Sequence, residues 1–149
     1  RLSIKRWLQE QYPDREMPWY AIQTDEALDE LLSAEFPDIQ PGLTFTAAGF
    51  YGPQGRSLGR IPLGLPGLPD RLARFSFDGL HTTNFEMEGA AVMSMSRALG
   101  HKAGVICTIL ANRAEKSFHP APQEAEAHLI DTGLEVLAAW QRTSEAKRL

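Results

Sequence analysis

Residues 83–91 read Thr-Asn-Phe-Glu-Met-Glu-Gly-Ala-Ala, between a short β-prone stretch and a helical stretch rich in alanine and methionine. Strand side chains alternate between the faces of a sheet, so Glu86 and Glu88 at a strand exit can share one side. A carboxylate accepts two hydrogen bonds at once, which suits the neighbouring hydroxyls of a sugar, and Met87 can lie against the apolar face of the ring. Alternatively, both acids are ordinary first-turn residues favoured by the helix dipole.

Strand-like and helix-like patterns alternate along the rest of the chain. We expect helices over residues 2–11, 24–36, 70–77, 88–99 and 122–143. We expect strands over residues 43–47, 82–87 and 102–111. Thr24 is the expected N-cap of the second helix, and Gly100 ends the fourth. Strands that alternate with helices indicate an α/β layer architecture, and no repeat or linker divides residues 1–149, so a single domain is expected.

The run over residues 102–111 is the most apolar of the expected strands. We expect it to be central in the sheet and buried on both faces. Cys107 lies inside this run and is the chain's single cysteine, which excludes an internal disulfide. We interpret it as a small buried hydrophobic residue.

The segment from residue 49 to residue 69 holds six glycines and four prolines, too many for regular structure. A long loop inside a domain is usually functional or disordered. Here Gln54 offers a donor and an acceptor, Arg56 offers a fixed fork of donors, and Phe50 offers a ring face for stacking. These groups match the edge and face of a pyrimidine base. The alternative is a surface loop whose glutamine and arginine face water.

The composition is that of an ordinary globular protein, with 43% hydrophobic and 23% charged residues in a chain long enough for one core. The net charge of −4 provides no basic surface, so no nucleic-acid partner is expected. No apolar run approaches the roughly 18 residues of a membrane span, and the N-terminus does not resemble a signal peptide. The four histidines show no metal-ligand spacing. We therefore expect a cytoplasmic protein with no membrane partner and no metal.

Three segments carry a resemblance to a known family. Residues 84–88, followed by a helix of small residues, resemble the ribose-binding segment of the nucleoside phosphorylase family. Residues 104–113 resemble the next strand of that family. Residues 50–56, Phe-Tyr-Gly-Pro-Gln-Gly-Arg, resemble the uracil-binding loop of its uridine phosphorylase branch. The motifs stand in the family's order, and the resemblance spans roughly residues 42–143.

The resemblance implies a three-layer αβα fold with a mixed central sheet, of which this chain matches the C-terminal part. It also implies two groups of substrate-binding residues. The uracil group is Phe50, Gln54 and Arg56, with Arg113 in support. The ribose group is Glu86, Met87 and Glu88, with Glu86 supporting Glu88.

The implied reaction is the phosphorolysis of uridine to uracil and ribose 1-phosphate by a homo-oligomer, a dimer or hexamer. Phosphate is the co-substrate, no cofactor is needed, and no catalytic acid or base is assigned. The purine branches carry an aspartate at the position of Ala111, and its absence disfavours a purine substrate. The family's phosphate-binding motifs are not recognisable in residues 1–41. A non-catalytic nucleoside- or base-binding module, or less readily a purine phosphorylase or nucleosidase, is therefore the alternative.

Overall fold

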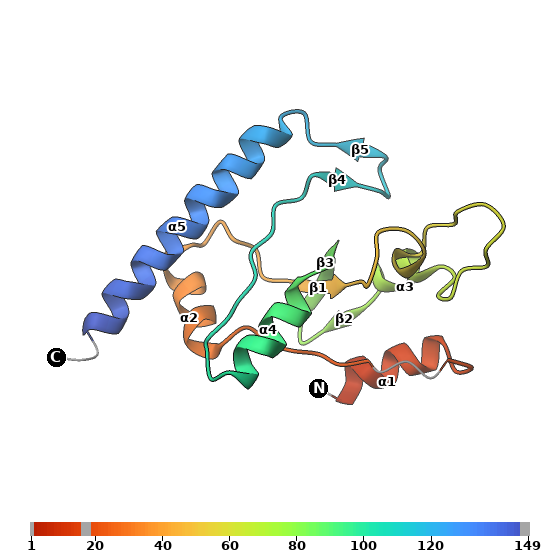
Figure 1. Cartoon of the computed structure of the whole chain (residues 1–149), viewed down its shortest axis with the longest axis horizontal. Helices are drawn as coiled ribbons and strands as arrows, with labels where there is room; N and C mark the ends of the chain where they lie inside the picture. The colour runs from red at the N-terminus through yellow and green to blue at the C-terminus, as the bar shows by residue number, and fades with distance from the viewer. Residues whose placement is uncertain (1, 16–18, 147–149) are drawn as a thin grey trace. The chain divides into compact units, whose positions relative to one another are not determined.

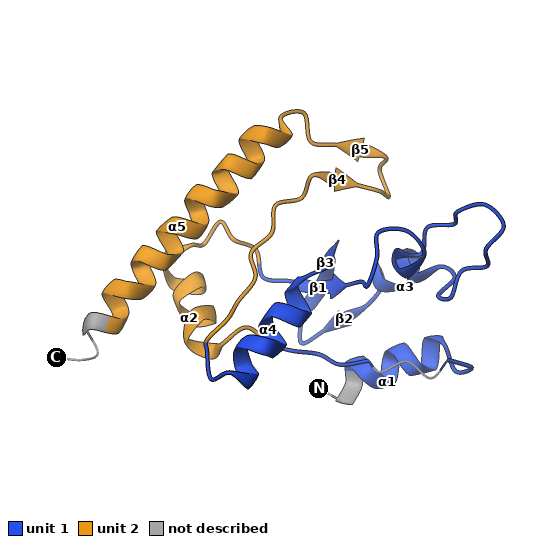
Figure 2. Ribbon diagram, viewed as in Figure 1, with its two compact units in different colours: residues 1–23, 41–101 blue, residues 24–40, 102–149 orange. Residues whose placement is uncertain are grey.

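The computed structural model describes residues 2–15 and 19–146 (Figure 1). These residues form two compact units, residues 1–23 with 41–101 and residues 24–40 with 102–149 (Figure 2). The helices are α1 (Leu2–Gln11), α2 (Glu26–Glu35), the 3-10 helix η1 (Gly52–Gln54), α3 (Leu68–Leu72), α4 (Gly89–Ala98) and α5 (Pro122–Ala146). The strands are β1 (Leu43–Thr46), β2 (Ser76–Phe77), β3 (Leu80–Glu86), β4 (Ala111–Asn112) and β5 (Ser117–Phe118).

The first unit is built on a mixed three-stranded sheet in the order β1-β3-β2. Strands β1 and β3 are parallel, and their last residues, Thr46 and Glu86, are register partners. Strands β2 and β3 form an antiparallel hairpin. The expected α/β class with a mixed sheet is confirmed. The carboxyl ends of β1 and β3 meet at one edge, so residues that follow them are brought together.

The hairpin corrects one expectation. Residues 70–77 were expected to be helical, whereas α3 ends at Leu72 and β2 begins at Ser76. Asp78 and Gly79, between β2 and β3, both have positive φ, 51° and 78°. An Asp-Gly pair with this geometry forms the tight turn whose twist suits a two-residue hairpin, and it requires a strand immediately before it.

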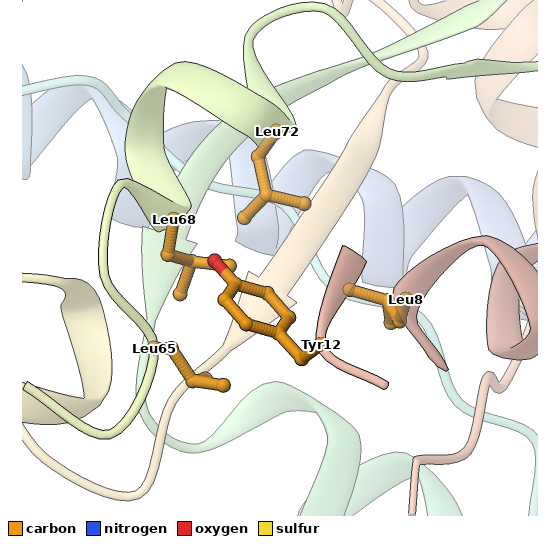
Figure 3. Close-up of a cluster of buried hydrophobic side chains, with 5 residues drawn as sticks. All are labelled: Leu8, Tyr12, Leu65, Leu68 and Leu72. Carbon is orange, nitrogen blue, oxygen red and sulfur yellow. The ribbon is translucent and has the colours of Figure 1, made fainter. Parts of the chain in front are cut away.

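The core of the first unit packs α1 against the end of the segment from residue 49 to residue 69, which we call the glycine-rich loop (Figure 3). Its members are apolar side chains with almost no exposed surface: Leu8, Tyr12, Leu65, Leu68 and Leu72. The Tyr12 hydroxyl donates a hydrogen bond to the Pro66 carbonyl oxygen at 3.2 Å. This cluster fixes the end of the loop, and with it the start of α3, against α1.

Helix α4 ends as the sequence predicts, at a left-handed glycine. Gly100 has φ +78°, and its N–H donates to the Arg97 carbonyl at 3.1 Å. The N–H of His101 donates to the Ser96 carbonyl at 2.8 Å. These two bonds satisfy the last carbonyl groups of the helix in the Schellman arrangement.

In the second unit, α2 contacts α5. The N-cap of α2 is Asp25 rather than the expected Thr24, and its carboxylate accepts a hydrogen bond from the Ala27 N–H at 3.2 Å. Lys102 Nζ lies 2.9 Å from the same carboxylate. The hydrogen bond from Lys102 is the main reason why the pKa of Asp25 is lowered. The carboxylate of Asp25 both caps the helix start and forms a salt bridge with the lysine, and the second of these needs a charge that a threonine hydroxyl lacks.

The expectation for residues 102–111 is wrong. Residues 102–110 carry no regular secondary structure, and only the short β4 pairs with β5. Cys107 is exposed rather than buried, and Ile109 is 49% exposed. A strand buried on both faces needs hydrogen-bonded neighbours along both edges. Besides the short β4–β5 pair, the described residues of this unit supply isolated main-chain bonds, from the Asp25 N–H to the Ala103 carbonyl at 2.9 Å and from the His119 N–H to the Leu110 carbonyl at 2.7 Å. Apolar sequence alone therefore does not make this segment a central strand.

Across the described residues, no helix combines the length and apolar character needed to cross a membrane.

Candidate functional site

Glu86 lies at the carboxyl end of β3, beside the first turn of α4. Its carboxylate accepts hydrogen bonds from the Thr46 hydroxyl, from the Glu88 N–H at 2.7 Å and from the Gly89 N–H. Burial raises the pKa of Glu86, but these hydrogen bonds outweigh burial and leave the pKa below its ordinary value. Glu86 is therefore an ionised group whose two oxygens are engaged inside the protein.

Glu88 does not lie at the strand end where the sequence pattern places it. Strand β3 ends at Glu86, so Met87 and Glu88 lie in a bend rather than in the strand. Glu88 is the N-cap residue of α4, and its exposed carboxylate accepts a hydrogen bond from the Met87 N–H at 3.1 Å. The turn, not strand alternation, sets its direction. Both Met87 and Glu88 present their side chains to solvent, where a polar ligand has access.

Neither acid lies in the first turn of α4, so the alternative interpretation of both as first-turn residues is not met as stated. Glu86 satisfies N–H groups at the start of α4, which is what an acid at a helix start does. Glu88 occupies the N-cap without a side-chain capping bond to the helix. The two carboxylates thus have different surroundings, and only Glu88 is exposed.

Thr46 was not singled out from the sequence. Its hydroxyl donates to Glu86 and accepts a hydrogen bond from the Ala90 N–H at 3.0 Å. A weak signal was present, since Thr44 and Thr46 alternate at the end of β1. Recognising it required the parallel register of β1 and β3, which two short segments about 40 residues apart do not specify by themselves.

The three loop residues that the resemblance assigns to uracil binding lie on and around η1; they are Phe50, Gln54 and Arg56. The guanidinium carbon of Arg56 lies 4.2 Å from the centroid of the Phe50 ring, a cation–π contact. The Tyr51 and Phe50 rings are perpendicular, with their centroids 5.1 Å apart, and the Tyr51 carbonyl accepts the N–H groups of Gln54 and Arg56, both at 3.0 Å. The structure thus brings Phe50 and Arg56 into contact.

Gln54 is buried, with 2% of the residue exposed. The alternative in which Gln54 simply faces water therefore does not describe this loop. Gly55 follows in the left-handed conformation, with φ +75°, and packs against α3. A buried amide is retained in a protein when it is hydrogen-bonded, so Gln54 belongs to the structured floor of the loop.

Arg113 belongs to the second unit, where it follows β4 and is half-buried. The turn that contains it is held by the Asn112 side-chain oxygen, which accepts the N–H groups of Ala114 and Glu115 at 3.1 and 3.3 Å. Ala111, the position of the purine-branch aspartate, is exposed in β4. The other six residues assigned to uracil or ribose all lie in the first unit.

Within the described ranges, no group of three His, Cys, Asp or Glu side chains is arranged to hold a metal ion.

Comparisons with known proteins agree on one family. Residues 6–139 match the family model described as the Phosphorylase superfamily. A uridine phosphorylase of Thermococcus kodakarensis is 33% identical over 107 residues, which are 70% of this chain and 36% of that protein.

A solved Trypanosoma brucei nucleoside phosphorylase, described as showing uridine phosphorylase activity, matches with a TM-score of 0.77 and 28% identity. The match covers 93% of this chain and 49% of the solved chain. The fold expected from the resemblance is thereby confirmed. This chain spans between about a third and a half of the length of these relatives.

Proposed function

Since this chain belongs to the phosphorylase superfamily, we propose that it supplies the nucleoside-binding half of a uridine phosphorylase. The reaction is the phosphorolysis of uridine to uracil and ribose 1-phosphate in nucleoside catabolism and pyrimidine salvage. The observation that carries the proposal is that one compact unit holds both the loop in which Arg56 lies over Phe50 and the exposed carboxylate of Glu88. The relatives named as uridine phosphorylases support it.

The base is bound by the loop. Uracil presents two carbonyl oxygens and one ring N–H, which an amide and a guanidinium can read together. The Arg56 guanidinium lies over one face of the Phe50 ring, so a base that stacks on that face displaces it toward the edge of the base, where it donates to the carbonyl oxygens. Gln54, held in the floor of the loop, supplies the amide.

The ribose is bound at the start of α4. Glu88 accepts hydrogen bonds from the 2′ and 3′ hydroxyls, and the exposed thioether of Met87 lies against the sugar ring. Glu86 supports this arrangement rather than touching the sugar, because both its oxygens already accept hydrogen bonds from the protein.

Cleavage of the glycosidic bond separates charge, since the ribose becomes oxocarbenium-like and the leaving uracil becomes anionic. Donors from Gln54 and Arg56 stabilise the anion, which is electrostatic catalysis by preorganised groups. Glu88 holds the sugar in place while its anomeric carbon moves toward phosphate, which is a positioning effect. No general acid is required for a leaving group stabilised in this way.

Phosphate is the co-substrate, and no cofactor takes part. A helix N-terminus is a common anion site, but three N–H groups at the start of α4 already have acceptors within the protein: Glu86 accepts those of Glu88 and Gly89, and Thr46 accepts that of Ala90. We therefore assign phosphate binding to polypeptide other than the start of α4, including the portion of the relatives that this chain does not match. The functional protein is a cytoplasmic homo-oligomer, a dimer or hexamer.

A non-catalytic nucleoside- or base-binding module is the second candidate. Both candidates share the same base and ribose contacts, and they differ in whether phosphate is used. A purine substrate is disfavoured, since the methyl group of Ala111 cannot donate a proton.

The test is to titrate the purified chain with uridine and with inosine and to follow both by NMR. Uridine should bind more tightly, and Arg56→Ala should weaken it, while Arg60→Ala, at an exposed position of the same loop, should not. In a protein that performs the complete reaction, Arg56→Ala should cost about 2–4 kcal/mol of transition-state stabilisation. An unchanged kcat/KM for uridine would overturn the assignment of the base site.

A further inference from the structure

We propose that Thr46 is a positioning residue for Glu88: its hydroxyl, through the carboxylate of Glu86, fixes the start of α4 and so sets where Glu88 meets the ribose. The consequence for ribose rests on the proposed function. The contact network itself does not. Thr46 lies at the end of β1, outside the segments that resemble the family's ribose and uracil motifs.

The first step is the double role of the Thr46 hydroxyl. A hydroxyl has one hydrogen to donate and two lone pairs to accept with, so it can serve two partners at once. Here it donates to Glu86 on β3 and accepts from the Ala90 N–H of α4. The main chain closes the same junction, since the Ala47 N–H donates to the Glu86 carbonyl at 2.8 Å. Three elements of the first unit therefore meet at one side chain.

The second step links Glu86 to Glu88. The main-chain N–H of Glu88 donates to the Glu86 carboxylate at 2.7 Å, so the backbone that carries the Glu88 side chain is tied to Glu86. Gly89 makes this approach possible, because a Cβ at that position would lie 3.1 Å from the Glu86 carboxyl carbon and both its oxygens. The junction is thus packed to the point where only glycine fits without displacement.

The third step concerns charge. Glu86 and Glu88 are two residues apart, and an unsatisfied Glu86 would compete for the same donors as the ribose-binding carboxylate. The hydroxyl and the two N–H groups engage both oxygens of Glu86, with Thr46 on one oxygen and the two amides on the other. Removing the hydroxyl releases one oxygen of Glu86 and the N–H of Ala90 together. The start of α4 then loses its hydrogen bond to the Thr46 side chain of β1.

The experiment compares three variants of the chain by NMR. Thr46→Val keeps the shape and removes the hydroxyl, and Thr46→Ser restores it. Thr44→Val is the matched control: its hydroxyl, two residues earlier on β1, donates to Asn84 at 2.8 Å, away from α4. The readouts are the amide signals of the α4 start, the titration of the Glu86 carboxyl group, and the affinities for uridine and for uracil.

In Thr46→Val we expect the amides of Glu88 and Gly89 to shift and the pKa of Glu86 to move toward its ordinary value. We expect the affinity for uridine to fall by about tenfold, the size of a lost hydrogen bond to a charged group, while the affinity for uracil is retained. Thr46→Ser should recover both properties, and Thr44→Val should leave both unchanged. A general loss of stability would not separate uridine from uracil in this way.

Two results would overturn the proposal: Glu88 and Gly89 amides that do not respond to Thr46→Val, or an unchanged ratio of uridine to uracil affinity. If Thr46→Val does not fold, Glu86→Gln tests the same junction, because an amide nitrogen cannot accept the N–H groups that the carboxylate accepts. If the parent chain binds no uridine while the amides respond as expected, the proposed function fails and the positioning contact stands.

Discussion

Gly55→Ala should be far more harmful than its position in a long loop suggests. Gly55 lies between Gln54 and Arg56 with φ +75°, a conformation that costs a residue with a Cβ about 1–2 kcal/mol. The added Cβ would also lie 2.6 Å from Cδ and 3.2 Å from Cγ of Pro69. A proline ring has little freedom to move aside, so overpacking adds about 1–3 kcal/mol. The expected loss of unfolding free energy is about 2–5 kcal/mol.

Two other glycines of the loop separate these two contributions. Gly59 has φ +62°, and within the described residues no atom lies within 4 Å of a Cβ built there, so Gly59→Ala should cost only the conformational part, about 1–2 kcal/mol. Gly52 has neither a positive φ nor a neighbour within that distance among the described residues, so Gly52→Ala should be close to neutral.

The assay is urea-induced unfolding of the parent and the three variants, followed by uracil titration of those that fold. Gly55→Ala should lower both stability and uracil affinity, because relieving the contact with Pro69 moves the residues on either side. The reasoning is refuted if Gly55→Ala and Gly59→Ala lose the same free energy, since the close approach to α3 would then have no energetic weight.

Three further predictions follow from the core, the carboxylates and the phosphate site. Leu68→Ala, at a side chain with 0% exposure, should cost about 2–5 kcal/mol in urea unfolding, whereas Leu58→Ala, at 53% exposure, should stay within about 0.5 kcal/mol. The pKa of Glu86 is lowered on folding, so its contribution to stability is complete above the ordinary glutamate pKa and is lost as pH falls through the lower folded pKa. The unfolding free energy of Glu86→Gln should therefore fall less steeply on acidification than that of the parent, and equal slopes would contradict this. The chain alone should release no ribose 1-phosphate from uridine and phosphate, because without a site that holds phosphate next to the ribose the activation barrier rises by about 7–11 kcal/mol. Clear turnover would show that phosphate binds within these residues.

The elements that could be predicted from sequence are those specified by local signals. Helices α1, α4 and α5 follow from apolar periodicity, from Gly100 and from Pro122, and their observed bounds lie within about three residues of the expected ones. Strand β3 is also predicted from the sequence, because its β-prone residues come directly before the residues that form helix α4. A local signal was overlooked at residues 76–80, where the Asp-Gly pair specifies a hairpin.

The parts that could not be predicted depend on neighbours distant in sequence. Residues 102–110 have the composition of a buried strand, but a strand is defined by the chain that pairs with it, and composition does not name that partner. Thr46 was missed for the same reason, since its role exists only once β1 and β3 are in register. The seven substrate-binding residues remain predictions, and the structure adds which of them are exposed and which are engaged within the protein.

The irregular segment of residues 102–110 has a practical consequence for anyone who prepares this protein. It is rich in β-branched and aliphatic residues, contains no proline and carries a charge only at Lys102, and Ile109 is half exposed. Such a stretch is a template on which another copy can add main-chain hydrogen bonds, the route by which uncapped sheet edges aggregate. Aggregation should therefore increase with protein concentration. A charged residue placed in the segment, such as Ile109→Lys, should delay precipitation at high concentration, while the α4 start and the glycine-rich loop keep their structure.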